Sequence, residues 1–398
     1  MVGTSPNGKY VMAGLRKKSL AKAVFLGSLS AACALHVPES YAGDLDMRKH
    51  VVKFADLPSS DSNQTTGVQQ ASFSTGAEYK FTETACAPCT VPRQTAACAP
   101  WWAHRTGGFG ELLYLSAGNS DLIYALEQTG AVGAPSPTGP LGITNIGEHV
   151  GFRVGGSIAQ SDCSSIFGSF TRWDGQSTSV LNATGINVIA STVTHPSVDT
   201  TGSISLQANA LQSANFQFAD VGMRRVYKSS NHGVLNWNTG LRYGNMEQGL
   251  SANNLLSLPI GTTNVTTDID FNGFGILGGL DGMRYSTDTG LLVYGRAFGS
   301  LLAGDWTANY RQTSQFGGGV VANDYRDFRV SPVVDTELGV GWQNCNGRFR
   351  VTTGYLFSTW FNAVTTRDYI QSVRTASLLN MDDNLTFSGL TLRADLRF

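Results

Sequence analysis

The sequence predicts an all-β protein, an up-and-down antiparallel β-barrel of about ten strands that crosses a membrane after a mostly irregular N-terminal extension. Three observations predict this fold. Several segments place apolar residues on every second position, short and long connections alternate between these segments, and the composition is rich in glycine and poor in charge. Because strand side chains alternate between the two faces of a sheet, such segments have one apolar and one polar face.

The last ten residues, "GLTLRADLRF", show the alternation most clearly. One face would carry Leu390, Leu392, Ala394, Leu396 and Phe398. The other would carry Thr391, Arg393, Asp395 and Arg397. In a soluble sandwich the apolar face would meet a core, whereas in a membrane barrel it would meet lipid and the charged face would line the lumen.

The bulk composition favours the membrane alternative. Charged residues make up 14% of the chain, against about 25% in soluble domains. The balance of 28 Lys and Arg against 29 Asp and Glu gives no indication of nucleic-acid binding. No segment after the N-terminal region has the roughly 18 apolar residues that a membrane helix needs, so any membrane crossing must use strands.

The N-terminal residues 1–42 read as a signal peptide. The basic residues 16–18 precede an apolar stretch, and Ala42 ends it with a small residue at a plausible cleavage site. A short membrane anchor is the alternative, but Lys22 interrupts the apolar stretch. A lipoprotein site at Cys33 is a further alternative, which a polar residue upstream disfavours.

Residues 43–106 form the next predicted region, a Ser-, Thr-, Gln- and Pro-rich periplasmic extension, and the barrel is predicted to occupy residues 107–398. Signal-peptide cleavage would leave five cysteines, Cys86, Cys89, Cys98, Cys163 and Cys345. The "CAPC" motif has no second ligand pair, so we expect disulfides and neither metal binding nor redox catalysis. Unpaired thiols are the alternative, since connectivity cannot be read from a sequence.

The strand-like segments are separated by connections that alternate in length. Strands are predicted at 108–117, 147–160, 164–174, 211–228, 233–246, 266–285, 290–307, 328–343, 348–362 and 385–398. Short turns are predicted at 161–163, 229–232, 286–289 and 344–346, and long loops at 118–146, 175–210, 247–265, 308–327 and 363–384. This alternation is typical of outer-membrane barrels with tight periplasmic turns and long external loops. An even number of strands also brings both chain ends to the periplasmic side.

Aromatic residues near strand ends are expected to form interfacial girdles, where a ring is half in lipid and half in water. They are Tyr114, Trp173, Tyr227, Tyr243, Tyr285, Trp306, Trp342 and Phe361. Ordinary core or carbohydrate-stacking aromatics are the alternative. Phe398 is predicted to be the assembly signal, because a terminal aromatic strand is what the barrel assembly machinery recognises in outer-membrane proteins generally.

Six motifs within residues 107–398 are distinctive: "HVGFRVGGS", "FGSFTRWD", "GLRYG", "FNGFGILGGLDGMRY", "LVYGRAFGSLLAGD" and "LGVGWQN…VTTGYLFSTWFN". Through them the chain resembles the Legionella-type major outer-membrane proteins, which are pore-forming barrels. The resemblance implies a location in the cell outer membrane and a porin-like role. It carries over no catalytic residues and does not reach the cysteines of the extension.

A set of charged residues on the polar strand faces is predicted to line the lumen. It comprises Arg153, Asp220, Arg224, Arg242, Arg296, Asp335, Glu337, Arg348, Arg350, Arg393, Asp395 and Arg397. Basic groups outnumber acids, so we expect weak anion preference if a pore exists. Ten strands enclose a narrow bore, however, and opposite charges on neighbouring strands could pair and fill it.

Three function classes follow from this interpretation. The first is passive diffusion of small hydrophilic solutes, and the alternative is a structural or surface-interaction protein with a filled barrel that presents its loops. The third is an outer-membrane hydrolase with His149 as a base, which lacks a nucleophile arrangement. We expect no enzyme activity, cofactor or metal. The expected partners are outer-membrane lipid, the barrel assembly machinery and small solutes, without nucleic acid, and a homo-oligomer is left open.

Overall fold

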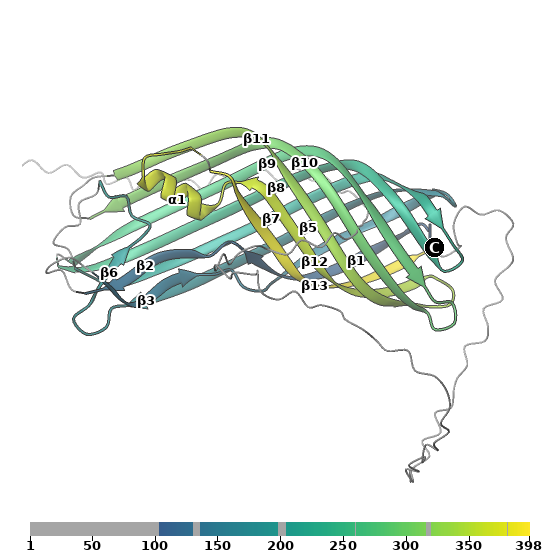
Figure 1. The fold of residues 1–398 in the computed structure, drawn as a ribbon, viewed down its shortest axis with the longest axis horizontal. Coiled ribbons are helices and arrows are strands. Elements are labelled where there is room, and N and C mark those ends of the chain that lie inside the picture. Colours follow the sequence, from purple (N-terminus) through teal and green to yellow (C-terminus); the bar gives the residue numbers. More distant parts are fainter. Residues whose placement is uncertain (1–102, 130–135, 198–203, 259, 316–319, 380) are drawn as a thin grey trace, which may run out of the picture. The chain divides into compact units, whose positions relative to one another are not determined.

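A ring of ten antiparallel strands forms the barrel (Figure 1). The computed structural model describes residues 103–129, 136–197, 204–258, 260–315, 320–379 and 381–398. The strands of the ring are β1 (Gly107–Gly118), β4 (His149–Ser161), β5 (Ser164–Asn182), β7 (Ile204–Ser229), β8 (Gly233–Leu258), β9 (Ile260–Tyr285), β10 (Leu291–Ser314), β11 (Val320–Gln343), β12 (Phe349–Ala363) and β13 (Asp383–Arg397). Around the ring their order is β1-β13-β12-β11-β10-β9-β8-β7-β5-β4. The predicted fold class, an antiparallel barrel of about ten strands, is therefore confirmed.

The last strand closes the ring against the first. Leu392 of β13 lies opposite Leu112 of β1, and the two strands pair along the whole of β1. Past the end of β13, the backbone N–H of Phe398 donates to the carbonyl of Thr106 at 2.8 Å. The C-terminus therefore lies beside the start of β1, at the end of the barrel with the short turns, which we call the periplasmic end.

Five neighbouring strands are much longer than a membrane crossing requires. β7, β8 and β9 have 26 residues each, and β10 and β11 have 24, whereas a transmembrane strand needs about 9–11. The long loops predicted at 247–265 and 308–327 are wrong, because the strands continue through both ranges. The barrel wall thus extends well past the membrane at the end opposite the C-terminus.

The apolar face changes sides along these strands, which is why the sequence pattern missed their continuation. On β9 the outward residues Phe274, Ile276 and Leu280 are exposed apolar side chains. Further along the same outward face stand Asn272 and then other polar residues, while the inward face there carries apolar residues such as Ile269. A wall surrounded by lipid needs an apolar outside, and a wall surrounded by water needs an apolar inside.

The change occurs at the same level on adjacent strands. One row of directly paired outward residues is Phe170, Ala219, Tyr243, Phe274, Ala303 and Val330. The next row in the same register is Arg172, Gln217, Asn245, Asn272 and Asp305, and it continues on β11 to the exposed ring of Phe328. On β5 to β10 these two rows mark the outer boundary of the lipid-facing belt.

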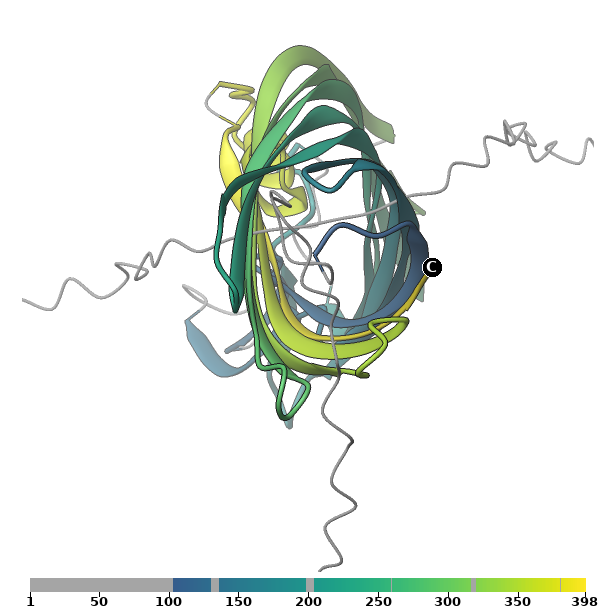
Figure 2. The same cartoon turned by 90° about the vertical axis from the view of Figure 1, so that its right-hand side faces the viewer.

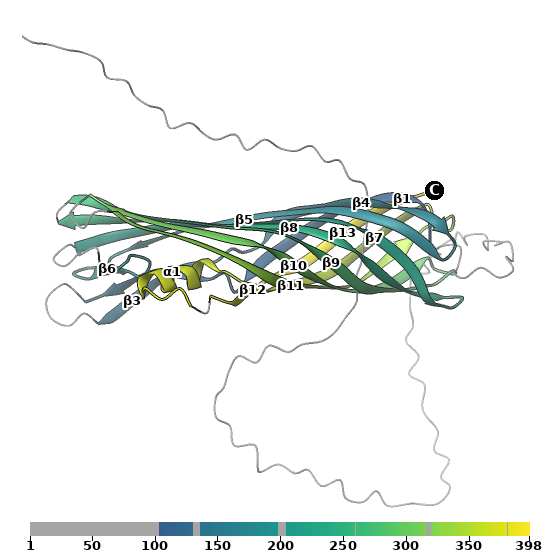
Figure 3. The ribbon, with the colours of Figure 1, turned by 90° about the horizontal axis from the view of Figure 1, so that it is seen from above.

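Beyond that boundary, a small sheet and a helix pack against the barrel at the end opposite the C-terminus (Figures 1 and 3). A three-stranded sheet has the order β3-β2-β6, formed by β2 (Leu122–Gln128), β3 (Pro137–Thr144) and β6 (Val188–Ser191). Helix α1 (Thr366–Arg374) begins after Thr365, whose side chain accepts from the backbone N–H of Asp368. Within α1, the Tyr369 hydroxyl donates to the carbonyl of Ala308 on β10 at 3.1 Å. These contacts fix the helix to the barrel.

No helix in the described ranges is both long and apolar enough to cross a membrane.

Candidate functional site

Charged side chains lie together inside the barrel at the level of the lipid-facing belt, and we call this set the ionic layer. It contains every residue predicted to line the lumen except Arg348, together with Glu111 and Asp281. Its members are Glu111, Arg153, Asp220, Arg224, Arg242, Asp281, Arg296, Asp335, Glu337, Arg350, Arg393, Asp395 and Arg397. Seven arginines stand against six carboxylates, so the predicted basic excess is small and most charges can be paired.

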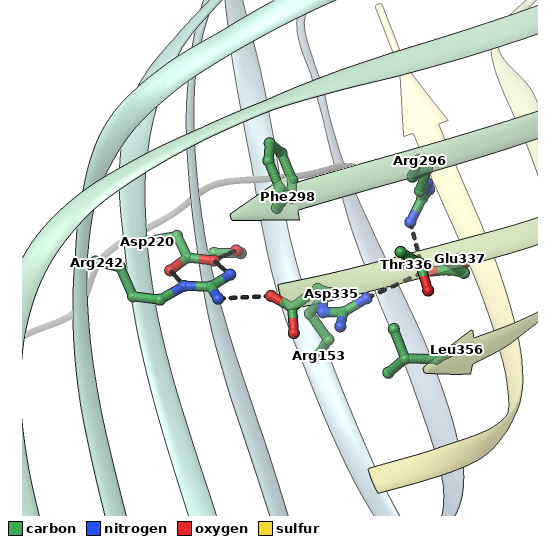
Figure 4. A pocket seen from close by; sticks show the side chains of 10 residues that line it. Arg153, Asp220, Arg242, Arg296, Phe298, Asp335, Thr336, Glu337 and Leu356 are labelled. Atoms are coloured by element: carbon green, nitrogen blue, oxygen red, sulfur yellow. Dashed lines mark hydrogen bonds and ion pairs between the residues drawn. The ribbon is translucent and has the colours of Figure 1, made fainter. Parts of the chain in front are cut away.

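Arg242 of β8 joins two walls of the barrel (Figure 4). Its Nε and Nη2 donate to the two carboxylate oxygens of Asp220 on neighbouring β7, at 2.7 and 3.0 Å. Its Nη1 donates to Asp335 on β11 at 2.5 Å. Because β11 is three strands away from β8 in the ring, this guanidinium crosses part of the lumen.

Glu337 of β11 is the centre of a second cluster. It accepts from the hydroxyl of Tyr294 at 2.6 Å and from Nη1 of Arg296 at 3.1 Å. Arg153 of β4 lies 3.5 Å from the same carboxylate and 2.8 Å from that of Glu111. Four steps around the ring separate β4 from β11, so these contacts also span the interior.

A third cluster lies toward the periplasmic end. Asp395 accepts from Arg350 at 2.9 Å and from Arg393 at 2.6 Å. Arg224 lies 3.7 Å from Asp281. Three small cavities lie among these side chains, one of about 30 Å³ and two of about 20 Å³. A cavity needs about 10–15 Å³ to hold a water molecule, so each has room for only one or two.

Above the ionic layer, buried aromatic rings from opposite walls meet in the interior. We call them the aromatic septum: Trp173, Phe216, Phe218, Phe271, Trp306, Trp360 and Phe387. Phe218 of β7 and Trp360 of β12 stack with centroids 5.1 Å apart and planes at 10°. Their strands are five steps apart in a ring of ten, hence on opposite sides, and the ring seen end-on is flattened (Figure 2). The septum therefore bridges the lumen.

Three aromatics predicted for the interfacial girdles lie inside the barrel instead. Trp173, Tyr285 and Trp306 are almost fully buried, so their assignment to the girdle was wrong. The others are exposed: Tyr114, Tyr227, Tyr243, Trp342 and Phe361. Placement near a strand end does not decide which face a ring occupies.

Two carboxylates of the ionic layer were missed in the sequence, each for a local reason. Glu111 lies on β1, where Leu112 and Leu113 make both faces apolar, so alternation gives no register there. Asp281 lies on β9, where glycines interrupt the pattern. For Glu111 the available signal was its position as the one charged residue of β1, because a charge at membrane depth must face the interior.

Arg348 and Cys345 differ from their predicted roles. Arg348 is exposed in the turn between β11 and β12 and does not line the lumen. Cys345, in the same turn, is a free thiol, so its predicted disulfide is wrong. Cys163 is not a free thiol. Cys86, Cys89 and Cys98 lie outside the described residues, as do the predicted signal peptide and nearly all of the predicted extension.

The residues before β1 enter the periplasmic mouth of the barrel. Ala103 packs with Val234 and Tyr285. The His104 ring lies in a hydrogen bond with Asn236, with Nε2 3.0 Å from Oδ1, and its Nδ1 has no partner among the described residues. Burial, with a smaller contribution from nearby Arg224, lowers the pKa of His104 to about 4. The imidazole is therefore neutral in the folded protein at pH 7.

His149 is not arranged as a catalytic base. Its Nδ1 lies 3.1 Å from the carbonyl of Gly147, and its Nε2 lies 3.4 Å from the backbone N–H of Gln176. Both ring nitrogens thus face the backbone, and the ring packs edge-on against Trp173. The described ranges also hold no group of three or more His, Cys, Asp or Glu side chains that could bind a metal ion.

Comparison with known proteins gives one family match. The model of the Legionella pneumophila major outer membrane protein precursor matches residues 110–398, from β1 to the C-terminus. No curated protein matches the chain.

Among solved structures, the outer membrane protease OmpT from Escherichia coli is similar with a TM-score of 0.40 and 9% identity, over 74% of this chain and 97% of that one. The toluene transporter TodX from P. putida is similar with a TM-score of 0.34 and 11% identity, over 79% of this chain and 93% of that one.

Proposed function

The chain belongs to the Legionella major outer membrane protein family, and from this premise we propose that its outer-membrane β-barrel is a structural and surface-interaction protein with a closed interior. One observation carries the proposal: the aromatic septum joins opposite walls, with Phe218 stacked on Trp360. An open pore for hydrophilic solutes needs a continuous polar channel. The septum interrupts such a channel with seven buried aromatic rings.

The part of the protein beyond the membrane supports this role. The long strands β7 to β10 carry mostly polar residues outward past the row that contains Tyr243 and Phe274. Their inner faces pack on α1 through Tyr369 and on the small sheet through Tyr124. The part of the barrel wall beyond the membrane thus resembles a water-soluble domain with its own apolar core. Such a domain is suited to contacts at the cell surface.

A gated pore is the second candidate, and the ionic layer favours it. Ionisable residues at membrane depth are expensive and usually functional, and an apolar filling is often at least as stable as buried ion pairs. Passive diffusion of small solutes, the role expected from the sequence, would then require the septum and the ion pairs of Arg242 to move apart. The slight arginine excess supports a weak anion preference in that open state.

We propose no catalytic activity. The family match supports this, and the contacts of His149 give no support to the hydrolase alternative. Export by the signal peptide and recognition of Phe398 by the assembly machinery stay predictions, and homo-oligomer formation stays open. Phe398 is highly exposed at the end of β13, as recognition by another protein requires.

Liposome swelling with sugars of graded size, combined with single-channel conductance, tests the proposal. The refolded wild-type barrel is expected to admit no sugar and to show no sustained conductance. A variant with Phe218→Ala and Trp360→Ala is expected to conduct, because it removes both rings of the stacked pair. Steady uptake of the smallest sugar by the wild type would replace the closed-barrel proposal with the porin.

A further inference from the structure

A groove of about 590 Å³ lies near the periplasmic end of β8 to β11. Its floor contains Gly282 of β9 and Gly295 of β10, which are direct partners in register. Leu235 of β8 lies opposite Gly282, and Leu338 of β11 lies opposite Gly295. The two leucines lean toward the glycines, since an added Cβ would lie 2.9 Å from Cδ2 of Leu338 at Gly295 and 3.5 Å from Cδ1 of Leu235 at Gly282. The glycines and leucines together form a shallow apolar furrow on the outward face.

The glycine floor is interrupted where the two strands continue into the lipid-facing belt. The next outward pair is Leu280 and Ala297, and the Leu280 side chain is exposed. Only in the row after that are two glycines, Gly278 and Gly299, direct partners again. The groove itself therefore holds only the part of a hydrocarbon chain that lies over Gly282 and Gly295.

Two cations stand at the periplasmic end of the furrow. Arg284 is the next outward residue after Gly282 on β9, and Lys228 of β7 lies opposite Leu235. Both line the groove and are exposed. At the other edge of the belt, outward Arg172 is already paired with Asp174 at 2.7 Å. The ion pairs of the described residues include no acid for Arg284 or Lys228.

We propose that this groove binds one anionic glycerophospholipid of the periplasmic leaflet. An acyl chain lies over Gly282 and Gly295 between the two leucines, and the lipid phosphate accepts hydrogen bonds from Arg284 and Lys228. The volume falls within the range of about 300–1,000 Å³ typical of small-molecule sites. Apolar walls inside the belt match hydrocarbon, and unpaired cations at the headgroup level match a phosphate. The site needs only the membrane location, so it stands whether the lumen is closed or gated.

Native mass spectrometry of the full-length barrel in detergent micelles tests this site. The probes are phosphatidylglycerol, phosphatidylcholine and inorganic phosphate. Gly282→Leu fills the furrow, and Lys228→Gln with Arg284→Gln removes the cations. Gly110→Leu is the matched control for the first change, because Gly110 is outward on β1 with no atom within 4 Å of an added Cβ and five strands from β9. Arg348→Gln, in an exposed turn at the same end, is the control for charge.

One phosphatidylglycerol is expected to bind per barrel, with phosphatidylcholine weaker. Each lost cation should weaken phosphatidylglycerol binding roughly 5-fold, Gly282→Leu should abolish it, and both controls should bind as the wild type. Equal binding of the two lipids, competition by inorganic phosphate alone, or equal losses in the controls would overturn the proposal.

A shift of Gly282→Leu from dimer to monomer would also overturn it, by assigning the groove to a second copy of the chain. Heat-dependent migration in electrophoresis reports whether each variant is folded. If Gly282→Leu does not fold, the Lys228→Gln and Arg284→Gln variant still tests the proposal, since both side chains are exposed and their replacement is not expected to prevent folding.

Discussion

Trp360 of β12 stacks on Phe218 of β7 from the opposite wall of the barrel, with ring centroids 5.1 Å apart. Arg242 lies directly below this pair, with its guanidinium carbon 4.2 Å from the centre of the Phe218 ring. The apolar septum and the ionic layer are thus in contact, and a cation–π interaction connects them. A substitution in the aromatic septum is therefore expected to affect the ionic layer, and the reverse.

Removal of the Phe218 ring should destabilise the barrel and open a leak. Phe218→Ala is expected to lower the free energy of unfolding by about 3–5 kcal/mol, since a buried phenyl ring leaves a cavity. Denaturant unfolding in detergent and bilayer conductance are the measurements. Phe274→Ala is the matched control, because that ring faces outward on β9. Equal destabilisation by both changes would contradict the septum.

Neutralising Glu337 should be among the most damaging changes in the ionic layer. Glu337→Gln leaves Arg296 and Arg153 without that carboxylate, and an uncompensated buried charge costs about 3–5 kcal/mol. Denaturant unfolding measures the loss. The control is Glu148→Gln, because Glu148 is exposed just before β4. A loss no larger than that of the control would show that the buried pairs are not coupled.

An arginine on the outer wall should report the level of the membrane boundary. Leu280→Arg on β9, six residues inside the boundary row, is expected to cost about 2–4 kcal/mol, because the charge would face hydrocarbon near the middle of the belt. Asn264→Arg, outward on the same strand beyond the boundary, should be nearly neutral because it faces water. Unfolding and refolding in lipid vesicles gives both values. Similar costs at the two positions would place the boundary elsewhere.

Acid should loosen the segment that enters the periplasmic mouth. His104 has a pKa of about 4 when folded, against 6.5 when unfolded. Above pH 6.5 both states are neutral, so its contribution is constant. Between pH 6.5 and 4 the unfolded segment binds the extra proton, and stability falls by up to about 3 kcal/mol.

Amide hydrogen exchange of residues 103–106 at pH 7 and pH 5, corrected for intrinsic rates, measures this loss. In the His104→Gln variant the pH dependence should disappear. Protection that stayed the same from pH 7 to pH 5 in the wild type would contradict the buried neutral imidazole.

Much of the fold follows from local pattern alone. Alternation in segments such as Leu390 to Phe398, with short turns between segments, predicted all ten ring strands and the pairing of the last strand with the first. The alternation pattern failed where one strand passes from lipid into water. On β8 the outward face changes from Leu241 and Tyr243 to Asn245 and Glu247, so the pattern seemed to end although the hydrogen-bonded ladder continues.

The sequence predicted which residues of the candidate site face the lumen, but not which contacts they make there. Arg242, Asp220 and Asp335 were expected to share the lumen, but neither their pairing nor the closure by Phe218 and Trp360 was visible in the sequence. By itself the sequence determined that the strands would form a membrane barrel, because strand periodicity and lipid solubility are properties of short segments. Only the tertiary structure decided which side chains meet across the lumen, because ring flattening and contacts between strands three to five steps apart depend on how the whole barrel closes.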